Sequence, residues 1–170
     1  MLRIIKIGLV LSVALWGVLG ARGNLIDLKG TIDAVGAVTS MATFPGGGGR
    51  WEATTNPAVI LAGAAFIVLF KLATVLLCLA GAWRMWTHRK SDAETFGRAK
   101  TLALTGCAVA VFSLFLGWTV IGESWFEFWR SDALPPAADG ALRYGGFIAL
   151  IALMVGARDG EDQPLASSRR

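Results

Sequence analysis

Lys71 is the residue whose chemistry most needs an explanation, because it lies near the centre of the apolar run 58–83. A lysine at the centre of a membrane span costs about 2.5–3.5 kcal/mol on insertion scales, and its side chain extends only a short way toward water. Thr74 follows three residues later and would share its helix face. We therefore predict a polar site within the membrane at Lys71 and Thr74, suited to an anion, a proton or an acidic partner.

The sequence leaves the state of Lys71 open. The four apolar runs of the chain contain no Asp or Glu, and the nearest candidate carboxylate is Glu123, just past the third run. Lys71 is therefore expected to be neutral, hydrated in a cavity, bonded to hydroxyl or carbonyl groups, or paired with an acid from another chain. The alternative is a helix that sits off-centre in the membrane and lets the ammonium approach water.

A second candidate is the segment 123–130, in which aromatic and charged residues are interleaved. Its marker residues are Glu123, Trp125, Phe126 and Trp129. Amphipathic rings prefer the headgroup layer, so the segment is predicted to be a helix lying at the outer interface. A stripe of this kind can also form a quinone site or dock a protein partner, and this reading is the alternative.

No set of residues predicts catalysis, a cofactor or a bound metal. His88 is the only histidine and is expected to be solvated in a basic loop. Cys78 and Cys107 are expected at similar depths on neighbouring helices, as packing residues rather than a redox pair. Without clusters of His and Cys, neither a haem pair nor a zinc site is predicted. The glycine run 46–49 lacks the GK[ST] ending of a phosphate-binding loop, so we expect a protein that is not an enzyme.

The composition predicts the class of protein. Of the 170 residues, 55% are hydrophobic and only 16% are charged, whereas soluble domains carry about 25% charged residues. Each apolar run is long enough to cross a hydrocarbon layer as a helix of about 20 residues, and lipid offers the backbone no hydrogen bonds. We predict an all-α polytopic membrane protein, whose four-helix transmembrane domain covers residues 1–157. Its helices are expected at about 4–21, 58–83, 101–121 and 141–157.

The connections between these helices differ in length and composition. The long first outer loop, 22–57, begins with apolar residues spaced as on one face of a short surface helix, namely Ile26, Leu28, Ile32, Val35 and Val38. Pro135 and Pro136 are expected to end the aromatic segment, and Asp139 to cap the fourth helix. The polar tail 158–170 is expected to be disordered in the cytoplasm.

The distribution of Lys and Arg predicts the orientation. With both termini inside, the inner segments hold ten Lys and Arg residues and the outer segments hold five, Lys71 being left out. This excess predicts cytoplasmic N- and C-termini. The first run also has features of a signal peptide, with Arg3 and Lys6 at its start and small residues near Gly20. Cleavage there is the alternative to a retained first helix.

A set of short motifs lies around the ends of the expected helices, at residues 24–27, 40–41, 43–46, 78–84 and 122–126, and at Trp129. As a set they resemble the bacterial family of predicted small integral membrane proteins known as domain of unknown function 2165, over most of residues 1–157. The resemblance implies a four-helix protein of the plasma (inner) membrane of a bacterium, with no assigned reaction. Two positions depart from the family pattern: Ala42 replaces an acidic residue, and Lys71 replaces a glutamate. A role that rests on that carboxylate is therefore not carried over to this chain.

The expected function is that of a non-enzymatic accessory or stabilising subunit of a membrane complex, because an unpaired intramembrane lysine and an aromatic outer segment suit docking. The alternative is a small oligomeric transporter or channel in which Lys71 lines a polar pathway. An enzyme acting on a lipid or quinone is the third hypothesis. The expected partners are the lipid bilayer and either another membrane protein or further copies of the chain. No nucleic acid and no cofactor is expected.

Overall fold

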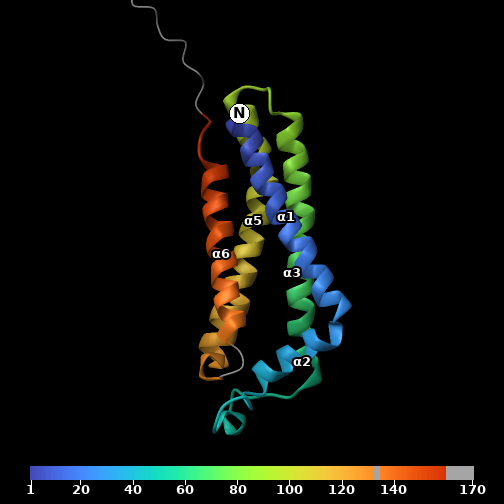
Figure 1. Ribbon diagram of the computed structural model, residues 1–170, viewed down its shortest axis with the longest axis vertical. Coiled ribbons are helices and arrows are strands. Elements are labelled where there is room, and N and C mark those ends of the chain that lie inside the picture. The colour runs from blue at the N-terminus through green and yellow to red at the C-terminus, as the bar shows by residue number, and fades with distance from the viewer. Residues whose placement is uncertain (132–134, 160–170) are drawn as a thin grey trace, which may run out of the picture.

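The computed structural model describes residues 1–131 and 135–159 of the chain. Within these residues every regular element is a helix, and four helical segments are long and apolar enough to cross a membrane. They are α1 (Leu2–Ile26), α3 (Pro57–Thr87), α5 (Thr101–Leu114) with its continuation η2 (Phe115–Trp125), and α6 (Pro135–Gly156). Figure 1 shows them side by side as a bundle. The prediction of an all-α, four-helix membrane protein is confirmed.

The helices extend past the apolar runs that predicted them. The Oδ1 of Asn56 accepts the N–H of Ala58 at 2.9 Å, and proline tolerates the first turn, so α3 begins at Pro57. α6 likewise begins at Pro135 rather than near residue 141, which places Asp139 inside the helix. The prediction that Asp139 caps this helix was therefore wrong. Of the tail predicted at 158–170, residues from 160 onward lie outside the described part.

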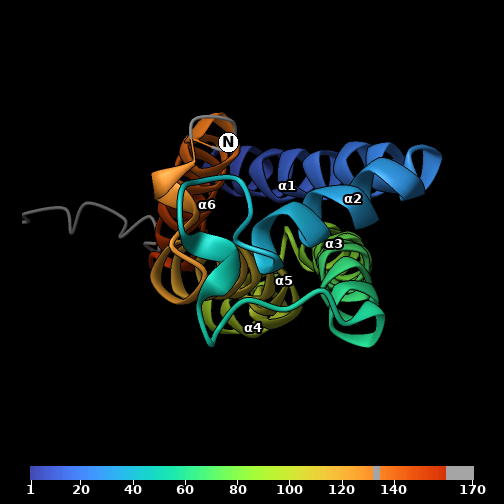
Figure 2. The same cartoon turned by 90° about the horizontal axis from the view of Figure 1, so that it is seen from below.

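The helices pack in the order α1, α3, α5, α6, and α6 closes the bundle against α1. Figures 1 and 2 show that α1 crosses the bundle obliquely, lying near α6 at the N-terminus and moving away from it toward α2. The fully buried side chains of the main core come from all four long helices and include Val10, Met85, Ala110 and Val155. The fold therefore buries a narrow apolar core and leaves most apolar side chains on the outer surface.

Glycines allow α3 and α5 to approach closely. A Cβ on Gly81 would lie 2.5 Å from the Cα of Ala103, and one on Gly106 would lie 2.6 Å from the Sγ of Cys78. Small residues at such contacts are typical of packed membrane helices. Cys78 and Cys107 are buried free thiols that interact across the same contact, so the two cysteines are neighbours, as expected.

The segment η2 is wound as a π-helix. The N–H of Phe126 donates to the carbonyl of Ile121, five residues back, at 3.0 Å. Gly122 lies within the wide turn, where a Cβ would lie 2.5 Å from the ring of Phe128. Such turns are rare and follow from local packing. The third long helix therefore runs beyond residue 121, where its apolar run ends.

Two shorter helices lie at opposite ends of the bundle. α2 (Leu28–Thr39) crosses the start of α3, where a short surface helix was expected. α4 (Ala93–Ala99) was not expected from the sequence. It forms because the carboxylate of Asp92 accepts the N–H of Thr95 at 2.8 Å and because the ring of Phe96 is fully buried.

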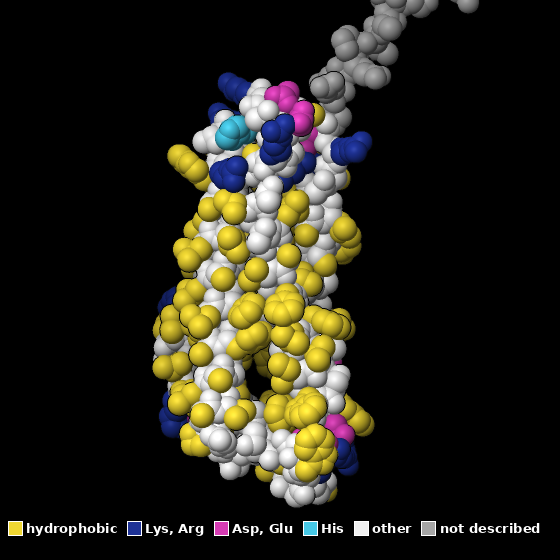
Figure 3. Space-filling view, turned by 180° about the vertical axis from the view of Figure 1, so that it is seen from behind, with side chains coloured by type: hydrophobic (Ala, Val, Ile, Leu, Met, Phe, Trp, Pro, Cys, Tyr) yellow, Lys and Arg dark blue, Asp and Glu magenta, His cyan; other side chains and the backbone are white. Residues whose placement is uncertain are grey.

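The two ends of the bundle differ in chemistry. The basic end consists of the start of α1, residues 84–100 and the end of α6, and Figure 3 shows Lys and Arg side chains gathered there. Hydrophobic side chains cover the middle of the same view. The opposite end, here called the aromatic end, holds α2 and the segments 40–56 and 123–131. The candidate sites lie toward these two ends.

Candidate functional site

The ammonium group of Lys71 has a partner within the chain. Its Nζ donates to the Oδ1 of Asn24 on α1 at 2.6 Å. The side chain passes over Gly20, where a Cβ would lie 3.3 Å from Cδ, Cε and Nζ of the lysine. At Gly17, one turn earlier, a Cβ would lie 2.8 Å from a methyl group of Val75. The two glycines therefore open a groove on α1 that receives the lysine.

Lys71 extends toward the aromatic end instead of remaining at mid-span. Asn24 is two residues before the end of α1, at the corner with α2. The same corner carries Arg22, Asp27 and Lys29, whose side chains are exposed, and exposed charges require contact with water or headgroups. This geometry is what the off-centre alternative requires, and the distance of the ammonium group from the membrane surface stays a prediction.

Asn24 is oriented by Thr31 on α2. The Nδ2 of Asn24 lies 3.2 Å from the Oγ1 of Thr31, which in turn lies 3.1 Å from the carbonyl of Asp27. Because Nδ2 faces this hydroxyl, Oδ1 is left to accept from Lys71. Sequence reasoning did not single out Asn24, although it begins the 24–27 motif. One polar contact thus joins α1, α2 and α3.

Thr74 does not take part in the contact at Lys71. Its hydroxyl donates to the carbonyl of Phe70 in its own helix at 2.9 Å, and its side chain is fully buried. This local bond satisfies the hydroxyl. The structure therefore does not bring Lys71 and Thr74 into one polar site, and a role of Lys71 in binding a solute or a partner stays a prediction.

Asn24→Leu is expected to destabilise the protein more than Lys71→Met. The leucine removes the acceptor and leaves the ammonium unpaired, which costs about 1–3 kcal/mol or more for a charged group. Methionine removes the charge while its flexible chain still covers Gly20, so the free energy of unfolding should change by less than about 1 kcal/mol. Thermal unfolding in one mild detergent measures both variants. Equal losses of stability would contradict the importance of this bond.

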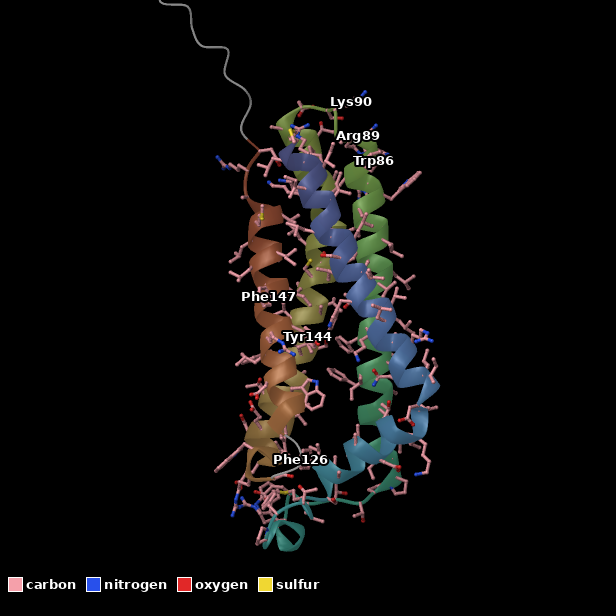
Figure 4. The ribbon with its side chains drawn as sticks, in the orientation of Figure 1. Trp86, Arg89, Lys90, Phe126, Tyr144 and Phe147 are labelled. Atoms are coloured by element: carbon pink, nitrogen blue, oxygen red, sulfur yellow. The ribbon has the colours of Figure 1, made fainter. Side chains whose placement is uncertain are left out.

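At the aromatic end, two segments far apart in the sequence pack into one structure, the outer platform, defined as residues 40–56 and 123–131. It contains the short helices η1 (Gly47–Gly49) and η3 (Phe128–Arg130). Phe126 packs against Met41 and Phe44 in a small buried cluster, and Figure 4 shows Phe126 at this end of the bundle. The two segments therefore share a core of their own.

Charged side chains connect the two segments of the outer platform. Arg50 lies 2.9 Å from a carboxylate oxygen of Glu127 and 3.2 Å from one of Glu52, and Arg130 lies 3.1 Å from Glu127. The hydrogen bond from Arg50 holds the pKa of Glu52 below its ordinary value. The carboxylate of Glu52 is therefore ionised beside Arg50 at neutral pH. Networks of this kind hold loops more firmly than isolated surface pairs do.

The four marker residues of the segment 123–130 differ in their exposure to solvent. Trp125 and Trp129 are 49% and 63% exposed, whereas Phe126 is only 6% exposed. Glu123 is partly buried. The backbone turns at Glu127, with a φ of 47°, so the predicted single interfacial helix is broken there. Phe126 consequently belongs to the platform core and not to its surface.

Sequence reasoning missed Trp51 as a member of this surface. Trp51 is 80% exposed and meets Trp125 edge to face, with ring centroids 5.4 Å apart. Trp51 lies in the first outer loop, and its contact with Trp125 depends on how two segments far apart in the sequence fold together. The exposed aromatic surface of the outer platform therefore consists of Trp51, Trp125 and Trp129.

At the basic end, two buried lysines meet the C-terminal end of α6. The Nζ atoms of Lys6 and Lys100 donate to the carbonyl of Ala157 at 2.7 and 2.9 Å, and both pair with the carboxylate of Asp159. Lys6 is 1% exposed and Lys100 is 3% exposed. A helix C-terminus favours cations because its last carbonyls are unpaired. This cluster therefore fastens α6 to α1 and to the start of α5.

The carboxylate of Asp159 stays ionised in this cluster. Burial would raise its pKa, but the hydrogen bonds and charges of Lys100 and Lys6 outweigh burial and hold the pKa below the ordinary value. Sequence reasoning counted Lys100 only among the orientation charges, and Lys6 also as part of the basic start of a possible signal peptide. Lys6 and Ala157 are 151 residues apart in the sequence, so no local pattern could have indicated their contact. Among the described residues, no three His, Cys, Asp or Glu side chains could together hold a metal ion.

These helices, with apolar side chains directed outward and charges gathered at the ends, define a multi-pass integral membrane protein. The chain belongs to the family described as predicted small integral membrane protein (DUF2165), whose model matches residues 2–158. The family resemblance expected from the short motifs is thereby confirmed. No curated protein and no solved structure gives a significant match.

Proposed function

We propose that this membrane protein is a non-enzymatic accessory or stabilising subunit of a membrane complex, and that the outer platform binds the partner. The observation that carries the proposal is the exposure of Trp51, Trp125 and Trp129 on a folded scaffold of their own. Tryptophan and arginine are the residues most enriched at the energetic centres of protein interfaces. The platform presents three exposed tryptophans beside Arg130, whose guanidinium lies over the ring of Phe44 at 4.7 Å.

The construction of the outer platform favours docking over simple anchoring in the headgroups. A tryptophan that only anchors a helix needs no partner from another loop. Here the Trp51–Trp125 contact and the Arg50–Glu127 ion pair hold the two segments in one arrangement. A surface that is already ordered loses less conformational entropy on binding. The platform therefore has the preorganisation that a protein interface uses.

The transport alternative has less support in the geometry. It requires Lys71 to line a polar pathway, whereas Lys71 lies in the groove between α1 and α3 with its Nζ on Asn24. Two hollows in the described part of the chain are lined mainly by apolar side chains, and Lys71 lines neither of them. We therefore favour the subunit over the transporter.

The proposal is tested by purifying the tagged protein from native membranes in a mild detergent and quantifying every protein that copurifies. Replacing Trp51 and Trp129 together by alanine is expected to lower the retained partner at least about tenfold. Trp83→Ala is the matched control, because Trp83 is 69% exposed but lies near the basic end. The proposal fails if no stoichiometric partner is retained, or if Trp83→Ala has the same effect as the double variant.

The orientation of the protein in the membrane is tested by a separate labelling experiment. We infer that both termini are cytoplasmic, because the basic end carries most of the Lys and Arg residues. The outer platform would then face the opposite side of the membrane. A cysteine introduced at the exposed Gly48 should react with an impermeant reagent in spheroplasts. Protection of that cysteine until the membrane is opened would overturn the orientation and redirect the search for the partner.

A further inference from the structure

An apolar groove runs along the side of the bundle between α1 and α6. Its volume is about 140 Å³, roughly that of five water molecules. The groove forms because α1 and α6 diverge toward the aromatic end, as Figure 1 shows. The groove is lined by Ser12, Val13, Trp16, Tyr144, Phe147, Ile148 and Ile151. It is open to the surrounding lipid and has room for a short run of methylene groups.

An arginine with no carboxylate partner among the described residues lies beside this groove. Arg143 is one turn before Phe147 on α6, so the two side chains share a face, and Figure 4 shows Phe147 on that helix. The guanidinium lies 5.3 Å from the ring centroid of Tyr144, which lines the groove. Within the described residues no carboxylate lies within ion-pair distance of Arg143. The hydroxyl group of Tyr144 likewise makes no hydrogen bond to any of the described residues.

The position of Arg143 in the span makes an anion necessary. Arg143 is exposed and lies eight residues after the start of α6 at Pro135, within the candidate membrane span. A guanidinium at such a place has to extend to the headgroups and pair there. Phosphate is the anion that its planar fork of donors fits best. A lipid phosphate of the adjacent headgroup layer is the anion that we expect this side chain to meet.

We propose that the groove between α1 and α6 seats an acyl chain of one anionic phospholipid, with Arg143 binding its phosphate and the Tyr144 hydroxyl as a second donor. The ring pair Trp16–Tyr144, with centroids 5.9 Å apart, bounds the groove toward the aromatic end. The chain then passes along Phe147 toward Ser12, where α1 and α6 come together. The occupant is a lipid of the leaflet at the aromatic end. The site is separate from the outer platform.

Native mass spectrometry of the detergent-purified protein, titrated with phosphatidylglycerol or phosphatidylcholine, tests this site. The wild type should retain one phosphatidylglycerol in preference to phosphatidylcholine, and Arg143→Gln should weaken that binding about tenfold. Arg22→Gln is the matched control, because Arg22 is an exposed arginine toward the same end of α1 with no ion-pair partner among the described residues. This control should bind phosphatidylglycerol like the wild type.

A second variant tests the seat of the acyl chain. Ser12 is exposed at the groove, so Ser12→Phe should fold normally and fill the space, which weakens binding of phosphatidylglycerol without touching Arg143. Unchanged melting of each variant shows that the fold is kept. The proposal is overturned if Arg143→Gln and Arg22→Gln bind alike, if phosphatidylcholine binds as well as phosphatidylglycerol, or if Ser12→Phe binds like the wild type.

Discussion

Gly81→Ala is expected to lower the free energy of unfolding by about 1–3 kcal/mol, the usual cost of forcing an extra methyl group into a packed interface. The added Cβ would lie 2.5 Å from the Cα and 2.7 Å from the Cβ of Ala103. These atoms belong to or adjoin the backbone of α5, so no flexible side chain can move aside. The two helices must separate, and the contact at Cys78 and Gly106 next to it is loosened as well.

Gly8→Ala is the matched control for this prediction. Gly8 also lies inside a long helix, but a Cβ there would meet no atom within 4 Å. Alanine favours the helix over glycine, so this variant should melt at the same temperature as the wild type or slightly above it. Thermal unfolding of both variants in the same detergent decides the matter. Similar melting temperatures for both would mean that α3 and α5 do not meet as closely as described.

Asp159→Ala is expected to destabilise the protein by about 3 kcal/mol, because it removes the carboxylate that pairs, among the described residues, with two buried ammonium groups. Lys6 and Lys100 would then share the carbonyl of Ala157 and repel each other. The end of α6 should come loose from α1. Thermal unfolding and limited proteolysis near residue 157 measure the two consequences.

The control for this variant is an ion pair of the same type at the surface. Glu94 pairs with Arg98 one turn along α4, with both side chains about 75% exposed. Glu94→Ala should leave the melting temperature unchanged, because exposed pairs contribute little. The pH dependence gives a second readout. The pKa of Asp159 is lowered in the folded state, so its contribution is complete above the ordinary carboxyl pKa and is lost as the pH falls through the lower folded value. If Asp159→Ala and Glu94→Ala melt alike, the cluster does not fasten α6.

The spans could be predicted because membrane insertion depends on a local property. An apolar run of about 20 residues is long enough to cross the hydrocarbon layer, whatever its exact first and last residues. For this reason the composition alone predicted α1 and α3. The ends were less predictable, since caps such as Asn56 and a proline start such as Pro135 decide them within one turn. The π-helical winding of η2 was not predicted from the sequence.

The candidate sites were predictable only in part, because the partners of their residues are distant in the sequence. Lys71 was recognised from its burial cost, but its acceptor Asn24 is 47 residues away on another helix. The aromatic segment was recognised from composition, yet the turn at Glu127 sends Phe126 inward and leaves Trp129 outward. Trp51 joined them only through tertiary packing. A pattern within one segment of the sequence cannot show which loops will pack together in the fold.

The contact of Lys6 with the carbonyl of Ala157 also has a consequence for biosynthesis. Helices enter the membrane in the order in which the ribosome delivers them, and here Lys6, in the second turn of α1, is bound by the residues that follow α6. The contacts that join α6 to α1 at the basic end cannot form until translation has passed residue 159. A chain released earlier would lack the carbonyl of Ala157 and the carboxylate of Asp159, which bind Lys6 and Lys100.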